Sequence, residues 1–280
     1  MSAVRIVTDS ACDLSDDEVR ELGIEVVPLT IRFGDEEYVD REQLTTRQFY
    51  DKLASHPELP QTAAPSPGAF TAAFRKLRDD GASEIVCINL SSSLSATMQA
   101  AQTGAKAVAD EIPVRVVDSR SITGGLGTIV LRAAQAARDG ASADDIVAIA
   151  KDLTARQRIF GTLDTLEYLK KGGRIGGAQA LLGSMLSIKP LVDLSSGEVK
   201  EAGRTRTRKK AFAWLRDAVR NHQPVENLRV IHGEAPDIDE FLAMLGEDVD
   251  LSTVQIGTIG AVIGTHGGPR VVGVAFHVRA

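Results

Sequence analysis

Short apolar runs rich in β-branched residues alternate with amphipathic segments through the first half of the chain. A run of this kind is typical of a strand buried in a sheet, whereas apolar residues spaced three and four apart mark one face of a helix. The strands predicted on this basis are residues 4–8, 24–31, 84–90 and 114–118, and the helices are residues 15–22, 46–55, 68–80 and 95–111. The alternation predicts a mostly parallel sheet covered by helices.

The pattern changes near residue 155, where mixed elements replace the long alanine-rich helices. A short helix is predicted to end at Gly172, and residues 178–192 are apolar on nearly every face, as in a helix buried between layers. The remaining elements are predicted as a hairpin over 189–203, helices at 207–222 and 236–246, and strands at 228–232 and 270–278. Two segments, 59–70 and 157–179, are expected to be functional or connecting loops. We therefore expect an α/β protein with an N-terminal domain over 1–155 and a mixed α/β domain over 156–280.

Composition narrows the classes of function. The 280 residues are 43% hydrophobic and 25% charged, which is typical of a globular chain of about two domains. The net charge of −6 argues against a nucleic-acid partner. Because no run of about 18 apolar residues occurs, we expect a cytoplasmic protein without stable membrane anchoring. Aromatic residues are scarce at 4%, which favours an aliphatic ligand over one that stacks. Cys12 and Cys87 form no CxxC pair, so neither a zinc site nor a redox pair is expected.

Hydroxyl side chains gather between the strand over 84–90 and the helix that follows it. They are Ser91, Ser92, Ser93, Ser95 and Thr97. Hydroxyls at a helix N-terminus either cap the helix or bind an anion, and five are too many for one cap. No glycine lies in this turn, which argues against a nucleotide pyrophosphate and favours a small anion such as a carboxylate. The acids after other strand ends, Asp9, Asp13 and Asp118, are expected to be structural, and Ser15 and Ser142 to be helix caps.

His266 is a candidate ligand-binding residue because it lies in a predicted loop with four neighbouring glycines. It could act as a base, a covalent handle, a metal ligand or a donor to a carboxylate. A metal is disfavoured because the other four histidines show no ligand spacing. Arg174 stands among glycines in KKGGRIGG and is suited to a phosphate or a partner protein. The cations of RTRTRKK precede a helix start, so at least one of them should have an anionic partner. No nucleotide-binding signature is present, so any ATP site would belong to another protein.

Eight motifs, taken in order, resemble the DegV family, which includes the fatty-acid-binding subunits of bacterial fatty acid kinase. They are TDSACDL, QTAAPSPGAF, INLSSSLSATMQAA, VVDSRSITGGLG, GTLDTLEYLKKGGRI, SIKPLV, RTRKKA and IGTHGGP, and they cover essentially the whole chain. The resemblance implies a two-domain α/β protein that holds one long-chain fatty acid between its domains. It further implies that the protein has no catalytic residues, metal or cofactor of its own, and that a separate kinase subunit phosphorylates the bound carboxylate to an acyl phosphate.

The resemblance also assigns roles to particular residues. Thr62 and Ser95 are implied to contact the carboxylate, with Ser92 as a neighbour and with His266 and Arg206 completing the polar network. Arg174 would face the kinase subunit. The acyl tunnel is expected along the helix over 178–186, at Leu182, Met185, Leu186 and Ile188. The sequence departs from the family pattern in having Ala63 and Ala64 after Thr62, and Ala96 and Met98 beside Ser95 and Thr97; these departures make the mouth less polar or slightly tighter.

Two other functions are compatible with these residues. One is a subunit acting on a small ketone or sugar in the manner of dihydroxyacetone kinase, with His266 as a covalent handle. The other is a regulatory module for which the lipid is only a signal. The shape of the site separates the first from a lipid carrier, because a long apolar tunnel suits a lipid and a small polar pocket suits a sugar.

Overall fold

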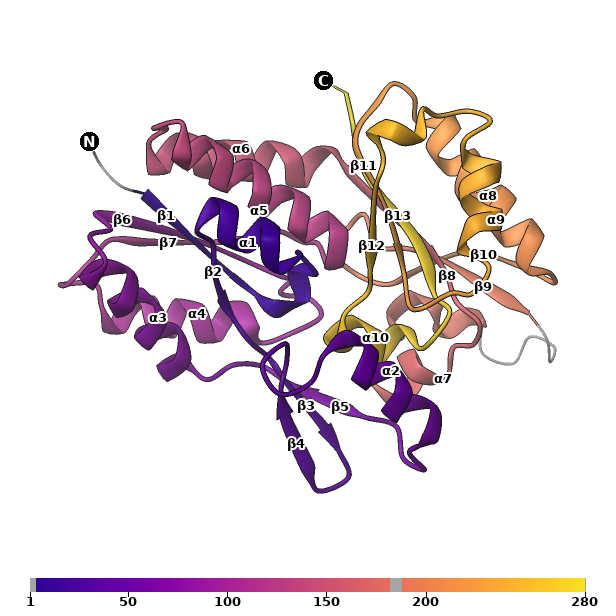
Figure 1. Ribbon diagram of the computed structural model, residues 1–280, viewed down its shortest axis with the longest axis horizontal. Helices are drawn as coiled ribbons and strands as arrows, with labels where there is room; N and C mark the ends of the chain where they lie inside the picture. The colour runs from indigo at the N-terminus through magenta and orange to yellow at the C-terminus, as the bar shows by residue number, and fades with distance from the viewer. Residues whose placement is uncertain (1–3, 182–187, 280) are drawn as a thin grey trace.

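The first sheet is parallel, as the alternation of strands and helices predicts. The computed structural model describes residues 4–181 and 188–279. Strands β1 (Val4–Asp9), β2 (Glu25–Val27), β6 (Glu84–Asn89) and β7 (Val114–Asp118) pair in the order β2-β1-β6-β7. Helices α3 (Pro67–Asp79) and α4 (Thr97–Ala107) cover one face, and α1 (Asp16–Leu22), α5 (Thr123–Arg138) and α6 (Ala143–Arg156) lie on the other (Figure 1).

The single strand predicted over residues 24–31 is wrong, because the chain divides at Pro28. Strand β2 ends at Val27, and β3 (Thr30–Phe33) joins a separate antiparallel sheet with β4 (Glu36–Val39) and β5 (Gln61–Ala63), in the order β4-β3-β5. Proline has no N–H to donate, so a strand is readily interrupted there. The segment 59–70, predicted as a loop, contains β5 and the start of α3. This small sheet projects from one edge of the molecule (Figure 1).

The second sheet has six strands and mixed pairing. It contains β8 (Gln157–Thr162), β9 (Lys189–Asp193), β10 (Lys200–Thr205), β11 (Val225–His232), β12 (Gln255–Thr258) and β13 (Val272–Val278), in the order β10-β9-β8-β13-β11-β12. All neighbours are antiparallel except β11 and β12. Helices α8 (Arg208–Asn221) and α9 (Ile238–Leu245) pack on the face turned away from the first sheet (Figure 1).

Several expectations for this second half need correction. The segment 157–179, predicted as a loop, begins with β8, an interior strand of the sheet. Strand β12 and helix α10 (Ala261–Gly267) were not predicted. The buried helix expected over 178–192 is instead a 3₁₀ turn over Gly176–Leu181 and strand β9, with residues 182–187 outside the described part of the chain. The hairpin over 189–203 is confirmed by the antiparallel pairing of β9 with β10.

Local signals at the helix ends are borne out. The Ser15 hydroxyl oxygen accepts a hydrogen bond from the Glu18 backbone N–H, and the Glu18 carboxylate accepts one from the Ser15 backbone N–H. The two bonds form a capping box at α1. Helix α2 (Thr46–Ser55) has an equivalent box built on Thr45, and Ser142 caps α6. Helix α7 (Glu167–Lys171) has Gly172 as its C-cap, in agreement with the predicted end of a helix at this glycine.

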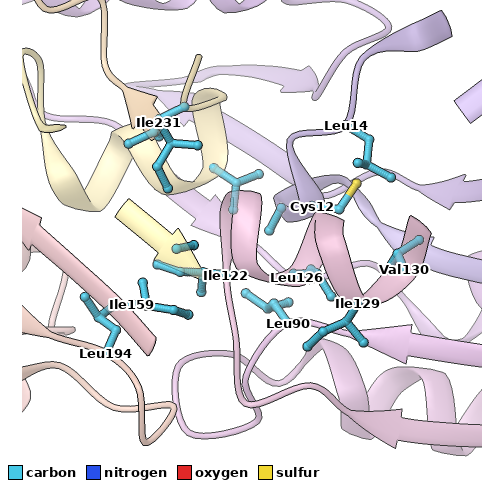
Figure 2. Packing of buried hydrophobic residues seen from close by; sticks show 14 of the residues in the cluster. Cys12, Leu14, Leu90, Ile122, Leu126, Ile129, Val130, Ile159, Leu194 and Ile231 are labelled. Carbon is cyan, nitrogen blue, oxygen red and sulfur yellow. The ribbon is translucent and has the colours of Figure 1, made fainter. Parts of the chain in front are cut away.

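Helix α5 lies between the two large sheets and connects their cores. Its first turn is rich in glycine, and a Cβ on Gly124 would lie 2.9 Å from Cγ2 of Ile231 on β11. Only glycine therefore permits this close approach of the helix to the second sheet. Ile122, at the start of the helix, lies beside Ile159 of β8, and Leu126 lies further along the helix in the same hydrophobic cluster (Figure 2). The main hydrophobic core thus lies at the junction of the two halves.

Candidate functional site

An apolar cavity lies between the second sheet and the end of the first. It encloses about 860 Å³ of space not filled by protein atoms, including the part open to solvent. Aliphatic side chains dominate its lining, and several of them appear in Figure 2: Leu90, Ile122, Ile159, Leu194 and Ile231. The polar side chains that line it are Thr62, Ser95, Thr123, Arg174 and His266. The cavity therefore suits a ligand that is largely hydrocarbon and carries one polar group.

His266 and Thr62 meet at the cavity although they are 204 positions apart in the sequence. The Oγ1 atom of Thr62, on β5, lies 2.9 Å from Nε2 of His266. The expectation that His266 lies in a loop is wrong, because it belongs to the last turn of helix α10. This helix also supplies Val262 and Ile263 to the cavity wall, so one short element presents both the polar group and the apolar surface.

His266 is held in its neutral form. Burial in the cavity wall, together with the nearby Arg174 guanidinium, lowers the pKa of His266 from 6.5 to about 4. Its Nδ1 atom is buried and has no hydrogen-bond partner among the described residues. A neutral imidazole carries one donor and one acceptor nitrogen, so the pair with Thr62 can offer a hydroxyl proton to a ligand oxygen. This arrangement suits an anion that accepts hydrogen bonds.

Ser95 and Arg174 approach the same region from two loops. Ser95 Oγ lies 2.8 Å from Thr97 Oγ1 and accepts a hydrogen bond from the Thr97 backbone at 3.3 Å. Ser95 thus helps to satisfy the start of α4 while it lines the cavity. The Arg174 guanidinium donates to the backbone oxygens of Leu94 and Gly172. Its carbonyl partners are neutral, so the Arg174 charge remains available to a bound anion.

Ser91 and Ser92 of the serine cluster have structural partners. Ser91 is buried and donates a 2.6 Å hydrogen bond to the backbone oxygen of Gly197, in the β9–β10 turn. Ser92 is exposed, and its hydroxyl and backbone N–H both donate to Asp118. Neither side chain lies in the cavity wall, so Ser91 and Ser92 contact the β9–β10 turn and Asp118, whereas Ser95 lies at the cavity. The structural role expected of Asp118 agrees with these contacts.

Two further groups of candidate residues lie away from the cavity or outside the described chain. Arg206 is exposed between β10 and α8, whereas Arg208 is half-buried and pairs with Asp237, Nε to Oδ2, at 2.7 Å. The anionic partner expected for this basic segment therefore belongs to Arg208. Ile188 is half-buried and does not line the cavity. The other expected tunnel residues, Leu182, Met185 and Leu186, lie outside the described residues.

Sequence reasoning missed most of the cavity wall, although a signal for it was present. Ile159 and Gly161 lie on one face of β8, and Leu163 continues their period of two just after the strand. Ile259, Val262, Ile263 and His266 follow the i, i+3, i+4, i+7 spacing of one helix face. Reading these two patterns would have predicted β8 and α10 and placed both at a buried surface.

A second, more polar cleft adjoins the polar end of the apolar cavity. Thr62, Arg174 and His266 line both this cleft and the apolar cavity, and Lys171 and Tyr168 add to its wall. The polar end of the cavity is therefore within reach of solvent. No group of three or more His, Cys, Asp or Glu side chains suited to a metal ion occurs within residues 4–181 and 188–279.

Known proteins match the sequence of this chain along almost its whole length. The family model described as "Uncharacterised protein, DegV family" matches residues 3–279. The chain belongs to the DegV family. A DegV domain-containing protein of Streptomyces coelicolor is 37% identical over 281 residues, covering 99% of each chain.

Solved DegV structures share the whole fold. A fatty-acid-binding DegV protein from Thermus thermophilus is 32% identical and superimposes with a TM-score of 0.90, covering 99% of this chain and 100% of its own. A stearic-acid-binding protein from Eubacterium ventriosum is 25% identical, with a TM-score of 0.88 over 99% of this chain and 98% of its own. Both of these structural neighbours are named as fatty-acid-binding proteins, and this chain shares their α/β fold, with a parallel sheet and a separate mixed sheet. Within the described residues, no helix is both long enough and apolar enough to cross a membrane.

Proposed function

We propose that this protein binds one long-chain fatty acid, with its hydrocarbon tail in the apolar cavity and its carboxylate at Thr62, Ser95 and His266. The observation that carries the proposal is a cavity with an aliphatic wall that ends at a small cluster of hydrogen-bonding groups. The fatty acids bound by structural neighbours of the same fold support it. The N-terminal domain, 1–155, would supply the hydroxyls, and the C-terminal domain, 156–280, would supply His266 and most of the wall.

The energetics favour a single acyl chain in this cavity. Burying hydrocarbon stabilises a complex by about 0.8 kcal/mol per methylene before the costs of association are subtracted. A carboxylate is expensive to bury unless hydrogen bonds replace its water. The hydroxyls of Thr62 and Ser95 can supply such bonds, and Arg174 brings a positive charge close to His266. The head group would then be held without being sealed away from solvent.

We further propose that the protein does no chemistry itself and presents the carboxylate to a separate kinase subunit. Two observations support this role. The residues at the polar end also line an outer cleft, through which a phosphoryl donor can approach a bound carboxylate. The chain also has no nucleotide-binding signature, so ATP would come with the partner. Arg174 lies on this cleft and would be near the partner. The aliphatic cavity wall argues against the alternative substrate, a small ketone or sugar.

The first test is mass spectrometry of the lipid extracted from gently purified protein. We expect one fatty acid per chain, or stoichiometric uptake of added fatty acid by delipidated protein. The absence of both would contradict fatty-acid binding and would favour the small polar substrate.

The second stage adds the cognate kinase subunit and ATP and traps acyl phosphate with hydroxylamine. The double variant Ser95→Ala, His266→Ala should fold but lose most of the acyl phosphate formed by the wild type. Bound fatty acid without any acyl phosphate would contradict the presenting role and would support a regulatory module. Unchanged product in the double variant would contradict the assignment of the carboxylate site.

A further inference from the structure

A row of four residues crosses the floor of the cavity, and its two central members have no side chain. Gly161 of β8 lies directly opposite Gly273 of β13. Outside them, Val192 of β9 pairs with Gly161, and Ile231 of β11 pairs with Gly273. Residues directly opposite one another in antiparallel strands point to the same face of a sheet. All four line the cavity, so the glycine pair leaves a depression in its floor, with a branched side chain at each end.

Larger side chains also lie beside the glycine pair along the direction of the strands. Ile159 on β8 and Leu163 just after this strand lie two positions from Gly161, and Val271, just before β13, lies two positions from Gly273. Side chains two positions apart in a strand point to the same face. The depression is therefore bounded along the strands by Ile159, Leu163 and Val271, and across them by Val192 and Ile231. Its size depends on the two missing side chains.

The space above Gly161 is not filled by neighbouring protein. A Cβ built on Gly161 would lie 3.4 Å from Cγ2 of Val192 and 3.7 Å from the backbone oxygen of Val272, at or near ordinary contact distance. A Cβ on Gly273 would lie 3.0 Å from the backbone oxygen of Phe160, which is tighter. Glycine in the interior of a strand is itself destabilising. Packing within the protein therefore does not account for glycine at position 161.

We propose that the acyl chain fills this depression, and that Gly161 and Gly273 set the length and bulk of the chain that the cavity accepts. The inference rests on the proposed function, because it assigns the glycine pair to the same hydrocarbon ligand. A methyl group at either position would project into the cavity and take the place of part of the chain. Protein with added methyls would then favour shorter fatty acids, while the polar end at Thr62 and His266 remained unchanged.

The test compares wild type, Gly161→Ala and Gly273→Ala in a competition among saturated fatty acids of increasing length, with bound lipid measured by mass spectrometry. For Gly161→Ala we expect at least a tenfold fall in affinity for the longest chain that the wild type binds. The affinity for chains shorter by two to four carbons should fall less, so the preference moves toward shorter chains. Gly273→Ala places its methyl group next to position 161 and should shift the chain-length preference in the same direction. It therefore provides an independent measurement if Gly161→Ala folds poorly.

Gly257→Ala provides the matched control. Gly257 lies in β12 of the same sheet, opposite Ile231, and outside the cavity wall. A Cβ there would be 4.0 Å from Ile231. This variant should keep the wild-type chain preference. If the wild type binds fatty acid and both floor variants keep its chain preference, the glycine inference is overturned while the proposed function stands. If the wild type binds no fatty acid of any length, both fail.

Discussion

Thr62 and His266 form a hydrogen-bonded pair at the polar end of the cavity. Burial and the Arg174 charge keep the imidazole neutral, with a pKa of about 4, so it contributes hydrogen bonding rather than charge at neutral pH. The Thr62 hydroxyl oxygen lies 2.9 Å from Nε2 of His266, and this hydroxyl can donate a hydrogen bond to a ligand oxygen. The positive charge near a bound carboxylate would come from the Arg174 guanidinium, which lines the same cavity.

Replacing Thr62 by valine removes this hydroxyl while nearly keeping the shape of the side chain. Hydrogen bonds to a charged group contribute about 1.5–3 kcal/mol, so fatty-acid affinity should fall by roughly 10- to 100-fold. Titration of delipidated protein with a fluorescent fatty acid would measure the change. Thr154→Val is the matched control, because the Thr154 hydroxyl donates to Ala150 within α6 and does not line the cavity. Equal affinities of Thr62→Val and wild type would place the carboxylate elsewhere.

Helix α10 is the element that positions His266. It packs against α2, where a Cβ on Gly264 would lie 2.7 Å from Cε1 of Phe49 and 2.8 Å from the hydroxyl of Tyr50. That hydroxyl donates a 3.0 Å hydrogen bond to the backbone oxygen of Ile259, just before the helix. Contact with α2 and anchoring by Tyr50 together hold α10 at the cavity wall.

Gly264→Ala tests this placement because two effects oppose each other. Alanine is better than glycine in a helix by about 1 kcal/mol, whereas overpacking a buried contact costs typically 1–3 kcal/mol. Phe49 and Tyr50 are buried and cannot move freely, so we expect a net loss of stability and weaker fatty-acid binding. Denaturant unfolding would measure the first effect. Gly68→Ala in α3, where the new Cβ would lie 3.6 Å from Ser66, should be neutral or slightly stabilising. If Gly264→Ala is as stable as Gly68→Ala, then Phe49 and Tyr50 of α2 can shift to accommodate the methyl group, and tight packing does not fix the position of α10.

The free energy of unfolding of the whole protein depends on pH because several ionisable groups are buried at and beside the junction of the two halves. His277 of β13 is 1% exposed, and burial lowers its pKa from 6.5 to about 4. Neither of its ring nitrogens has a hydrogen-bond partner among the described residues. Burial acts in the opposite direction on carboxyl groups, raising the pKa of Asp9 and of Asp40 to about 6. The two kinds of group therefore give opposite slopes of stability against pH.

The sign for His277 follows from its lowered pKa in the folded state. Its contribution to stability is complete above pH 6.5 and is lost as the pH falls toward 4, because the unfolded chain binds the proton first. His277→Leu should therefore gain roughly 2–3 kcal/mol relative to wild type between pH 7 and pH 4, as measured by urea unfolding across that range. Asp40→Asn should give the opposite sign, gaining relative to wild type as the pH rises from 4 to 6. A His277→Leu difference that stays constant with pH would contradict the burial argument.

The sequence by itself determined the local structure and the family. β-branched runs, capping residues such as Ser15, and the glycine after α7 act over a few positions, and the elements that they predict are present. Predictions failed where tertiary contacts overrode the local pattern. Residues 24–31 divide at Pro28 between two sheets, β8 pairs with residues 29 or more positions away, and α10 is short and rich in glycine.

Only the tertiary structure decided which of the candidate side chains face the cavity. Motif matching proposed Thr62, Ser95, Ser92, His266 and Arg206 together, and the fold brings Thr62, Ser95 and His266 to the cavity wall while Ser92 pairs with Asp118. The physical reason is that the destination of a hydroxyl or a cation depends on partners from distant segments. The apolar wall was likewise decided by the folded chain. Spacing of apolar residues can predict that one face of β8 or α10 is buried, but which buried faces enclose a cavity depends on packing among distant strands and helices.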